Sequence, residues 1–69
     1  MNRTPVQSSN VASVGYDSDS LTLEVEFTNG TVYQYFDVPT LEYENLIIAE
    51  SVGSYLNQNI KYNYRYAKT

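Results

Sequence analysis

Tyrosines spaced two residues apart are the feature of this sequence most able to do chemistry. Tyr33 and Tyr35 flank Gln34 in the stretch NGTVYQYF, and a second alternating set lies in the C-terminal stretch KYNYRYAKT. An unpaired RNA base can stack on an aromatic ring while a neighbouring cation contacts its phosphate. The candidate nucleic-acid-binding residues are therefore Tyr33, Tyr35, Lys61, Tyr62, Tyr64, Arg65, Tyr66 and Lys68.

A structural role is the other interpretation of the C-terminal segment. A chain of 69 residues forms one domain with a thin core, burying roughly 60% of the unfolded chain's surface. Aromatic rings supply buried area in bulk. The segment 61–69 could thus be a terminal strand or an extended tail that anchors one or two tyrosine rings. Anchoring is the favoured interpretation of the tail taken alone, and base stacking is the alternative.

Catalytic and metal-binding chemistry has little support in the sequence. The chain has no His and no Cys, and so lacks the commonest acid-base group at neutral pH and the strongest nucleophile. Glu24 and Glu26 share one strand face, but a working carboxylate pair needs a cleft. The acidic stretch 17–19 (DSD) resembles the start of a calcium loop, yet Leu21 and Thr28 stand where oxygen ligands are required. We expect a turn there, no enzyme activity, no cofactor and no metal.

Charge is divided unevenly along the chain. The net charge is -4, all eight acids lie between Asp17 and Glu50, and three of the four basic residues lie in the last nine positions. Such a body repels polyanions at long range, so a nucleic-acid contact must be local. No apolar run approaches the ~18 residues that span a bilayer, and the N-terminal stretch MNRTPVQSSN lacks a signal-peptide core. We expect a cytoplasmic protein without membrane contact.

Three strands are predicted in the first half of the chain. The short apolar run 11–16 ends at the turn-forming stretch DSDS. The segment 21–27 alternates strictly, with its apolar residues on one face and Glu24 and Glu26 on the other. Asn29-Gly30 then signals a hairpin, and 31–36 returns as the partner strand. Because an isolated hairpin is marginal, we expect all three strands to form an antiparallel meander.

Two short helices are predicted after Val38-Pro39. Tyr43, Leu46 and Ile47 follow helical spacing within about 40–50. The stretch 51–53 interrupts this helix, and a second, weaker stripe follows, formed by Val52, Tyr55, Leu56 and Ile60. Strands followed by helices predict an α+β fold, with a three-stranded antiparallel sheet and two helices packed on one of its faces. We expect one domain over 1–69, with an extended arm at 1–9 and a basic tail at 61–69. Its core should centre on Leu23, Val25, Phe27, Leu46 and Ile47.

The hairpin leaves two registers open, and they place the tyrosines on opposite faces. A two-residue type I′ loop at Asn29-Gly30 would set Tyr33 and Tyr35 on the wet face and bury Gln34. A type I turn with a bulge at Gly30 would instead set both tyrosines opposite Val25 and Leu23, with Gln34 outside. Burying an unpaired amide costs about 1 to 3 kcal/mol, whereas a Tyr ring buries readily. The bulged register is favoured.

Several stretches together resemble the KTSC domain, a module named from the C-terminus of some lysyl-tRNA synthetases. They are SSNVASVGYD, TLEVEFTNGTVYQYFDVP and SVGSYLNQNI, with the central Tyr33-Gln34-Tyr35 as the hallmark. The resemblance covers nearly the whole chain. It implies the α+β fold above, no settled activity, and a proposed connection with RNA. Gln34, Val52 and Gln58 stand where relatives often have basic residues, and Lys61 where Arg is usual.

The leading hypothesis for function is accordingly a small non-catalytic binding module for RNA or for an RNA-associated protein. The alternative hypothesis is a module for protein interaction or self-assembly. In that case exposed tyrosines, with Val32 or Phe36, would form the contact with another protein or with a second copy of the chain.

Overall fold

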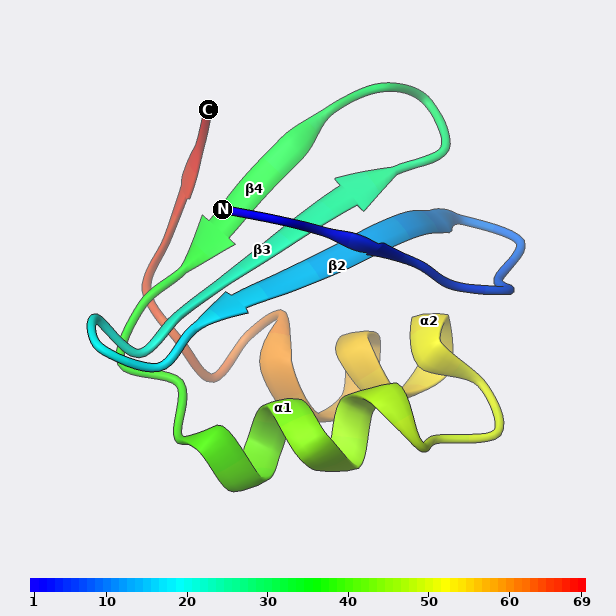
Figure 1. Ribbon diagram of the computed structural model, residues 1–69. Coiled ribbons are helices and arrows are strands. Elements are labelled where there is room, and N and C mark those ends of the chain that lie inside the picture. The colour runs from blue at the N-terminus through cyan, green and yellow to red at the C-terminus, as the bar shows by residue number, and fades with distance from the viewer.

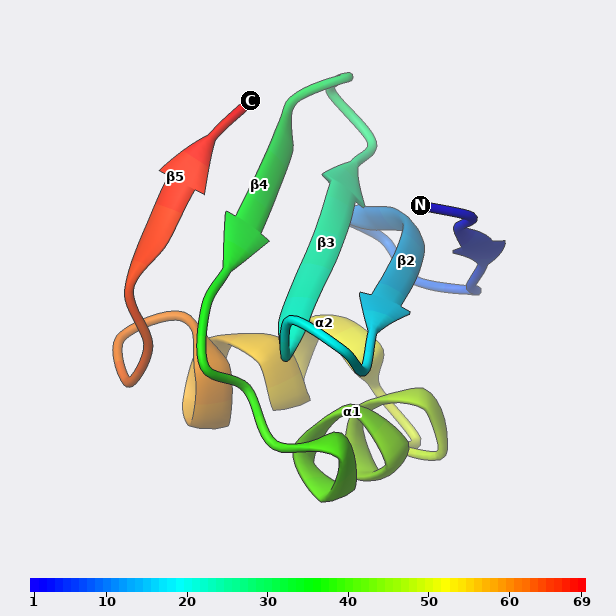
Figure 2. The same cartoon turned by 60° about the vertical axis from the view of Figure 1, so that its left-hand side comes forward.

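The computed structural model describes residues 1–69 and contains one five-stranded antiparallel sheet. Each strand pairs with the next along the chain, so the sheet is a simple meander (Figures 1 and 2). The strands are β1 (Thr4–Pro5), β2 (Val11–Asp17), β3 (Thr22–Phe27), β4 (Val32–Tyr35) and β5 (Tyr66–Lys68).

The three central strands confirm the sequence prediction, whereas the strand count of three was wrong. The two additional strands, β1 and β5, lie at the edges and are two and three residues long. All their residues are exposed, so neither segment carries the apolar alternation by which a half-buried strand is predicted. Tertiary pairing with β2 and β4, rather than local sequence, makes them strands.

The β3–β4 hairpin adopts the bulged register. Leu23 lies opposite Tyr35 and Val25 opposite Tyr33. The N–H of Gly30 donates to the Phe27 carbonyl at 2.9 Å, and Gly30 has a φ of 89°, a conformation that glycine adopts at little cost. Both tyrosines therefore point to the same face as Leu23 and Val25.

Polar side chains pair across the outer face of the sheet. Gln34 lies there opposite Glu24, and its Nε2 donates to Glu24 Oε1 at 3.0 Å. That hydrogen bond, with the Arg3 guanidinium, holds the pKa of Glu24 below its usual value. The amide that the other register would have buried is therefore paired near the surface.

The helical layer covers one face of the sheet (Figures 1 and 2). It consists of α1 (Thr40–Ile47), α2 (Val52–Tyr55) and the π-helical turn η1 (Leu56–Ile60), which continues α2. The first helix ends three residues before the predicted boundary at Glu50. The second begins after Ser51, whose Oγ accepts a hydrogen bond from the Ser54 N–H and so caps the helix. None of the helices has the length and apolar character that spanning a bilayer requires.

The core lies between the sheet and this helical layer. Its ten buried members are Val11, Val14, Leu23, Val25, Tyr35, Val38, Leu46, Val52, Leu56 and Ile60. Leu23, Val25 and Leu46 confirm the prediction. Phe27 is half-buried against the core, and Ile47 was predicted wrongly because it is 44% exposed. The helix turns its buried stripe toward Leu46, which leaves Ile47 on the flank of α1.

Candidate nucleic-acid interface

A small pocket beside β5 gathers five of the eight predicted binding residues. Its volume is about 180 Å³. The lining consists of Tyr33, Tyr35, Lys61, Tyr62 and Tyr66. We call it the tyrosine pocket. Three elements build it: β4, β5 and the chain that leaves η1.

Strand alternation explains why three of the rings meet. Tyr33 and Tyr35 are two residues apart and point to one face, and Tyr66 lies directly opposite Tyr35 in the β4–β5 ladder. The Tyr66 ring centroid lies 5.7 Å from that of Tyr33 and 5.9 Å from that of Tyr35. These distances fall in the range of favourable aromatic pairs. Backbone pairing between β4 and β5 thus holds these three aromatic rings together in the pocket.

The four tyrosines of the pocket differ in how far their side chains are exposed to a ligand. Tyr35 is 1% exposed and belongs to the core, whereas Tyr62 and Tyr66 are 82% and 59% exposed. Burial, with smaller effects of Tyr33 and Tyr66, raises the pKa of Tyr35 to about 12, so its hydroxyl is neutral at physiological pH. Tyr35 forms the floor, and the exposed rings present stacking surfaces.

The basic residues of the tail separate to two sides of the sheet. Lys61 lines the pocket, with its Nζ 5.6 Å from the Tyr62 ring centroid. Lys68 lies opposite Tyr33 and shares its face. Arg65 alternates with Tyr66 and lies on the outer face, where its guanidinium pairs with Asp37 at 2.9 Å. The structure therefore brings Lys61 and Lys68 to the pocket face and directs Arg65 away.

Tyr64 has a structural environment distinct from its neighbours. Its hydroxyl donates to Glu42 Oε2 at 2.8 Å, and the Tyr55 hydroxyl donates to the other oxygen of the same carboxylate. Burial and the Glu42 hydrogen bond raise the pKa of Tyr64 to about 12. Tyr64 therefore anchors the tail on α1, as the structural interpretation expected, while Tyr62 and Tyr66 remain exposed.

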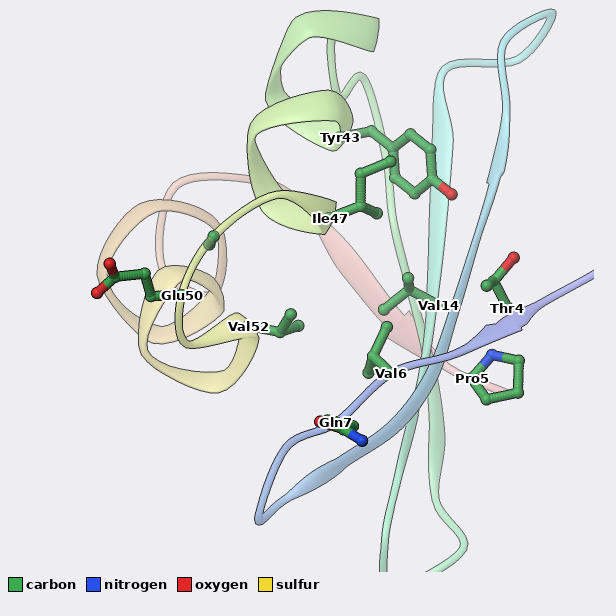
Figure 3. A pocket seen from close by; sticks show the side chains of 10 residues that line it. Thr4, Pro5, Val6, Gln7, Val14, Tyr43, Ile47, Glu50 and Val52 are labelled. Carbon is green, nitrogen blue, oxygen red and sulfur yellow. The ribbon is translucent and has the colours of Figure 1, made fainter.

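A second pocket, which the sequence did not indicate, lies at the opposite edge of the sheet. It has a volume of about 540 Å³ and lies among the N-terminal arm, β2, α1 and α2. Figure 3 shows Tyr43 and Ile47 of α1 facing Val14 and Val6 across it. We call it the arm pocket. It forms only because the arm folds back as β1, and no periodic signal in residues 1–9 predicted that.

The fold and these sites define a small α+β domain built on one antiparallel meander. The chain belongs to the KTSC domain family, because the family model described as KTSC domain matches residues 7–64. The resemblance identified from the sequence is thereby confirmed.

Similar proteins include both single-domain chains and parts of larger enzymes. An uncharacterized protein of Stutzerimonas stutzeri is 43% identical over 67 residues. These residues are 96% of this chain and 94% of the other protein. A lysine–tRNA ligase of Trichormus variabilis is 43% identical over 51 residues, which are 74% of this chain but 9% of the ligase. The KTSC domain is thus a small module that some lysyl-tRNA synthetases contain.

A solved structure supports the fold directly. A KTSC domain protein from Yersinia pestis superposes with a TM-score of 0.93 at 38% identity, covering 99% of this chain and 96% of that one. The two chains therefore share one overall fold across nearly their whole length.

Proposed function

We propose that this protein is a non-catalytic RNA-binding module and that unpaired bases contact its tyrosine pocket. The observation that carries the proposal is the convergence of Tyr33, Tyr35, Tyr62 and Tyr66 with Lys61 in one pocket. Aromatic platforms beside cations are the usual means of holding single-stranded RNA. The likeness to lysine–tRNA ligases adds support, since those enzymes act on an RNA.

In this proposal each residue has a different part in the contact. A base stacks on the exposed ring of Tyr62 or Tyr66, and the buried floor of Tyr35 limits how deeply it enters. Lys61, at the rim beside Tyr62, meets a phosphate, and Lys68 meets a second one on the same face. Each stacked base contributes about 1 to 3 kcal/mol when fully engaged.

Charge keeps the expected affinity low. The net charge is -4, and Arg65 is paired with Asp37. With two or three phosphates neutralised, the slope of log affinity against log salt should be no steeper than roughly -2 for a single strand. Stacking, rather than phosphate contact, should therefore supply much of the affinity.

Fluorescence anisotropy with short labelled single-stranded RNAs at two salt concentrations tests the proposal. Tyr62→Ala should weaken binding roughly tenfold, whereas Tyr62→Phe keeps the ring and should bind as well as the unchanged protein. Lys61→Gln should weaken binding and flatten the salt slope. Arg3→Gln is the matched control, since it removes the same charge at the far edge of the sheet and should leave the slope unchanged.

The same measurements can overturn the proposal. Absence of binding at low salt would remove the pocket as an RNA site, and so would Tyr62→Ala and Lys61→Gln variants that bind as tightly as the unchanged protein. The alternative of a protein-interaction module would then be preferred. It has its own support in α1 and its C-terminal end, where the apolar side chains of Leu41, Ile47 and Ile48 are exposed.

A further inference from the structure

The two edges of the sheet differ in their capacity to accept another strand. At one edge, β1 is two residues long and contains Pro5, which has no backbone N–H to donate. At the other edge, β5 contains no proline, and Figure 2 shows no further segment outside it. Exposed edges of this second kind are templates for pairing with another chain.

The hydrogen bonds of β5 show which backbone groups are free. The Phe36 N–H donates to the Arg65 carbonyl at 2.9 Å, and the Thr69 N–H donates to the Val32 carbonyl at 2.8 Å. Because paired groups alternate along an antiparallel strand, Arg65, Ala67 and Thr69 direct their backbone groups toward β4. Tyr66 and Lys68 therefore direct theirs away from the sheet.

We infer that the β5 edge pairs antiparallel with β5 of a second copy of this chain, about a two-fold axis at Ala67. This axis sets Tyr66 of each copy opposite Lys68 of the other. The outward N–H and C=O groups of the two residues then pair reciprocally, giving four hydrogen bonds with no outward group left unpaired. No proline or bulge interrupts the match.

The side chains agree with this register. Tyr66 and Lys68 point to the pocket face, so each Lys68 would lie beside a Tyr66 ring of the other copy rather than beside the other Lys68. A cation beside an aromatic ring is attracted to it. Ala67 meets only Ala67 of the second copy, on the outer face, where two methyl groups fit. Lys68 thus disfavours unspecific edge pairing but not this two-fold arrangement.

The pairing has a consequence for binding, although it does not rest on the RNA proposal. The two sheets would become one continuous sheet, with both tyrosine pockets on the same face beside the shared edge. Three-residue strands bury far less than the roughly 1,200 Å² of a stable interface, so the dimer should be weak and should exchange rapidly.

Sedimentation velocity without RNA tests the inference. The average mass should rise from 7.9 kDa toward twice that value across concentrations on the order of 10 µM to 1 mM, a range suited to a small transient interface. Lys68→Pro removes an outward N–H and none of the bonds to β4, so it should weaken dimerisation at least tenfold. Lys68→Gln is the matched control: it removes the charge but keeps the N–H, and it should weaken the dimer only a few-fold.

Amide resonances provide a second readout that needs no variant. In the unchanged protein the Tyr66 and Lys68 N–H signals should shift with concentration, and these amide protons should exchange more slowly with solvent as the fraction of dimer rises. The N–H signals of the β1 edge should stay constant. A mass of 7.9 kDa at every concentration would overturn the inference, as would a dimer unaffected by Lys68→Pro or shifts confined to α1.

Discussion

The two edges of the sheet each have a pocket beside them, but the pockets have different chemistry. The arm pocket at the β1 edge has three times the volume, about 540 Å³ against about 180 Å³, and six of its ten lining residues are hydrophobic, among them Val6, Val14 and Val52. The tyrosine pocket at the β5 edge combines aromatic rings with Lys61. The volume of a pocket alone therefore does not identify which of the two is better suited to bind a charged or planar ligand.

The edges also differ in how they are closed. The arm crosses β2 at Gly15, where a Cβ would lie 2.6 Å from the Asn2 carbonyl oxygen, and Arg3 then fixes the arm to Glu24 on the outer face. The β5 edge has no covering segment, and it is attached by Tyr64 and by the β4 ladder. The β1 edge is thus a two-residue strand that contains Pro5 and is held by an ion pair, whereas the β5 edge presents free backbone groups next to a pocket.

The largest expected effect comes from Tyr35, which belongs both to the core and to the tyrosine pocket. Tyr35→Ala should cost about 3 to 5 kcal/mol, because it empties a fully buried site in a domain whose total stability is about 5 to 15 kcal/mol. Tyr35→Phe keeps the ring and should cost less than about 1 kcal/mol. Urea unfolding followed by circular dichroism measures both.

Tyr62→Ala is the matched control for Tyr35→Ala, since Tyr62 lines the same pocket and is 82% exposed. It should change stability by no more than about 0.5 kcal/mol. If Tyr35→Ala were as mild as Tyr62→Ala, the β5 edge would not be anchored through the core, and the contrast between the floor and the rim of the pocket would be lost.

Alkaline pH should destabilise the fold by ionising Tyr35, which lines the tyrosine pocket beside the β5 edge. The pKa of Tyr35 is raised from 10.0 to about 12, so its contribution to stability is fully present below pH 10 and is lost as the pH rises through 12. The slope for this one group is at most about 1.4 kcal/mol per pH unit. Unfolding free energies at successive pH values, with tyrosinate absorbance, measure it.

Tyr35→Phe supplies the internal reference for this titration, because it removes the ionising group and keeps the ring. Its stability should fall less steeply above pH 10, with Tyr64, whose pKa is also raised to about 12, accounting for part of what remains. Identical alkaline profiles for the two proteins would show that ionisation of Tyr35 is not what destabilises the protein at high pH.

Glu42 should matter next, because one carboxylate accepts hydrogen bonds from both Tyr55 and Tyr64. Glu42→Ala leaves both hydroxyls without this partner and should cost about 1 to 3 kcal/mol. Glu44→Ala on the same helix is the matched control, since Glu44 is exposed, and should have little effect. Equal effects of the two substitutions would mean that Tyr64 does not hold the tail on α1.

The centre of this fold could be predicted from the sequence, and its edges could not. The alternation around Leu23 and Val25 and the Asn29-Gly30 signal predicted β3 and β4, and the cost of burying Gln34 favoured the register that the structure has. Helical spacing gave α1 but could not decide between Leu46 and Ile47, because that depends on how the helix rotates against the sheet. The edge strands lack any apolar pattern of their own.

The candidate site was predicted as a set of residue types but not as an arrangement. Which tail residues reach the pocket depends on the β4–β5 ladder, which places Tyr66 and Lys68 on one face and Arg65 on the other. The separation of Tyr64 from its neighbours depends on Glu42, 22 residues earlier in the chain. Both facts arise from tertiary pairing, which no local pattern in residues 61–69 specifies.

The smallest expected effects compare the ion pair at each edge. Arg3 Nη1 lies 2.7 Å from Glu24 Oε2, with side chains 31% and 12% exposed, whereas Arg65 and Asp37 are 77% and 73% exposed. An exposed pair contributes about 0 to 1 kcal/mol and is screened by salt. In urea unfolding, Arg3→Gln should therefore cost up to about 1 kcal/mol, and Arg65→Gln less than about half of that.

Salt and pH separate the two ion pairs further. About 1 M salt should remove the effect of Arg65→Gln and leave part of the effect of Arg3→Gln, because the Glu24 carboxylate is shielded from solvent. The Arg3 contribution should also be present above pH 4.5 and disappear as the pH falls through the lowered pKa of Glu24. A larger effect of Arg65→Gln at any salt concentration would reverse the comparison and make the β5 edge the one held by charge.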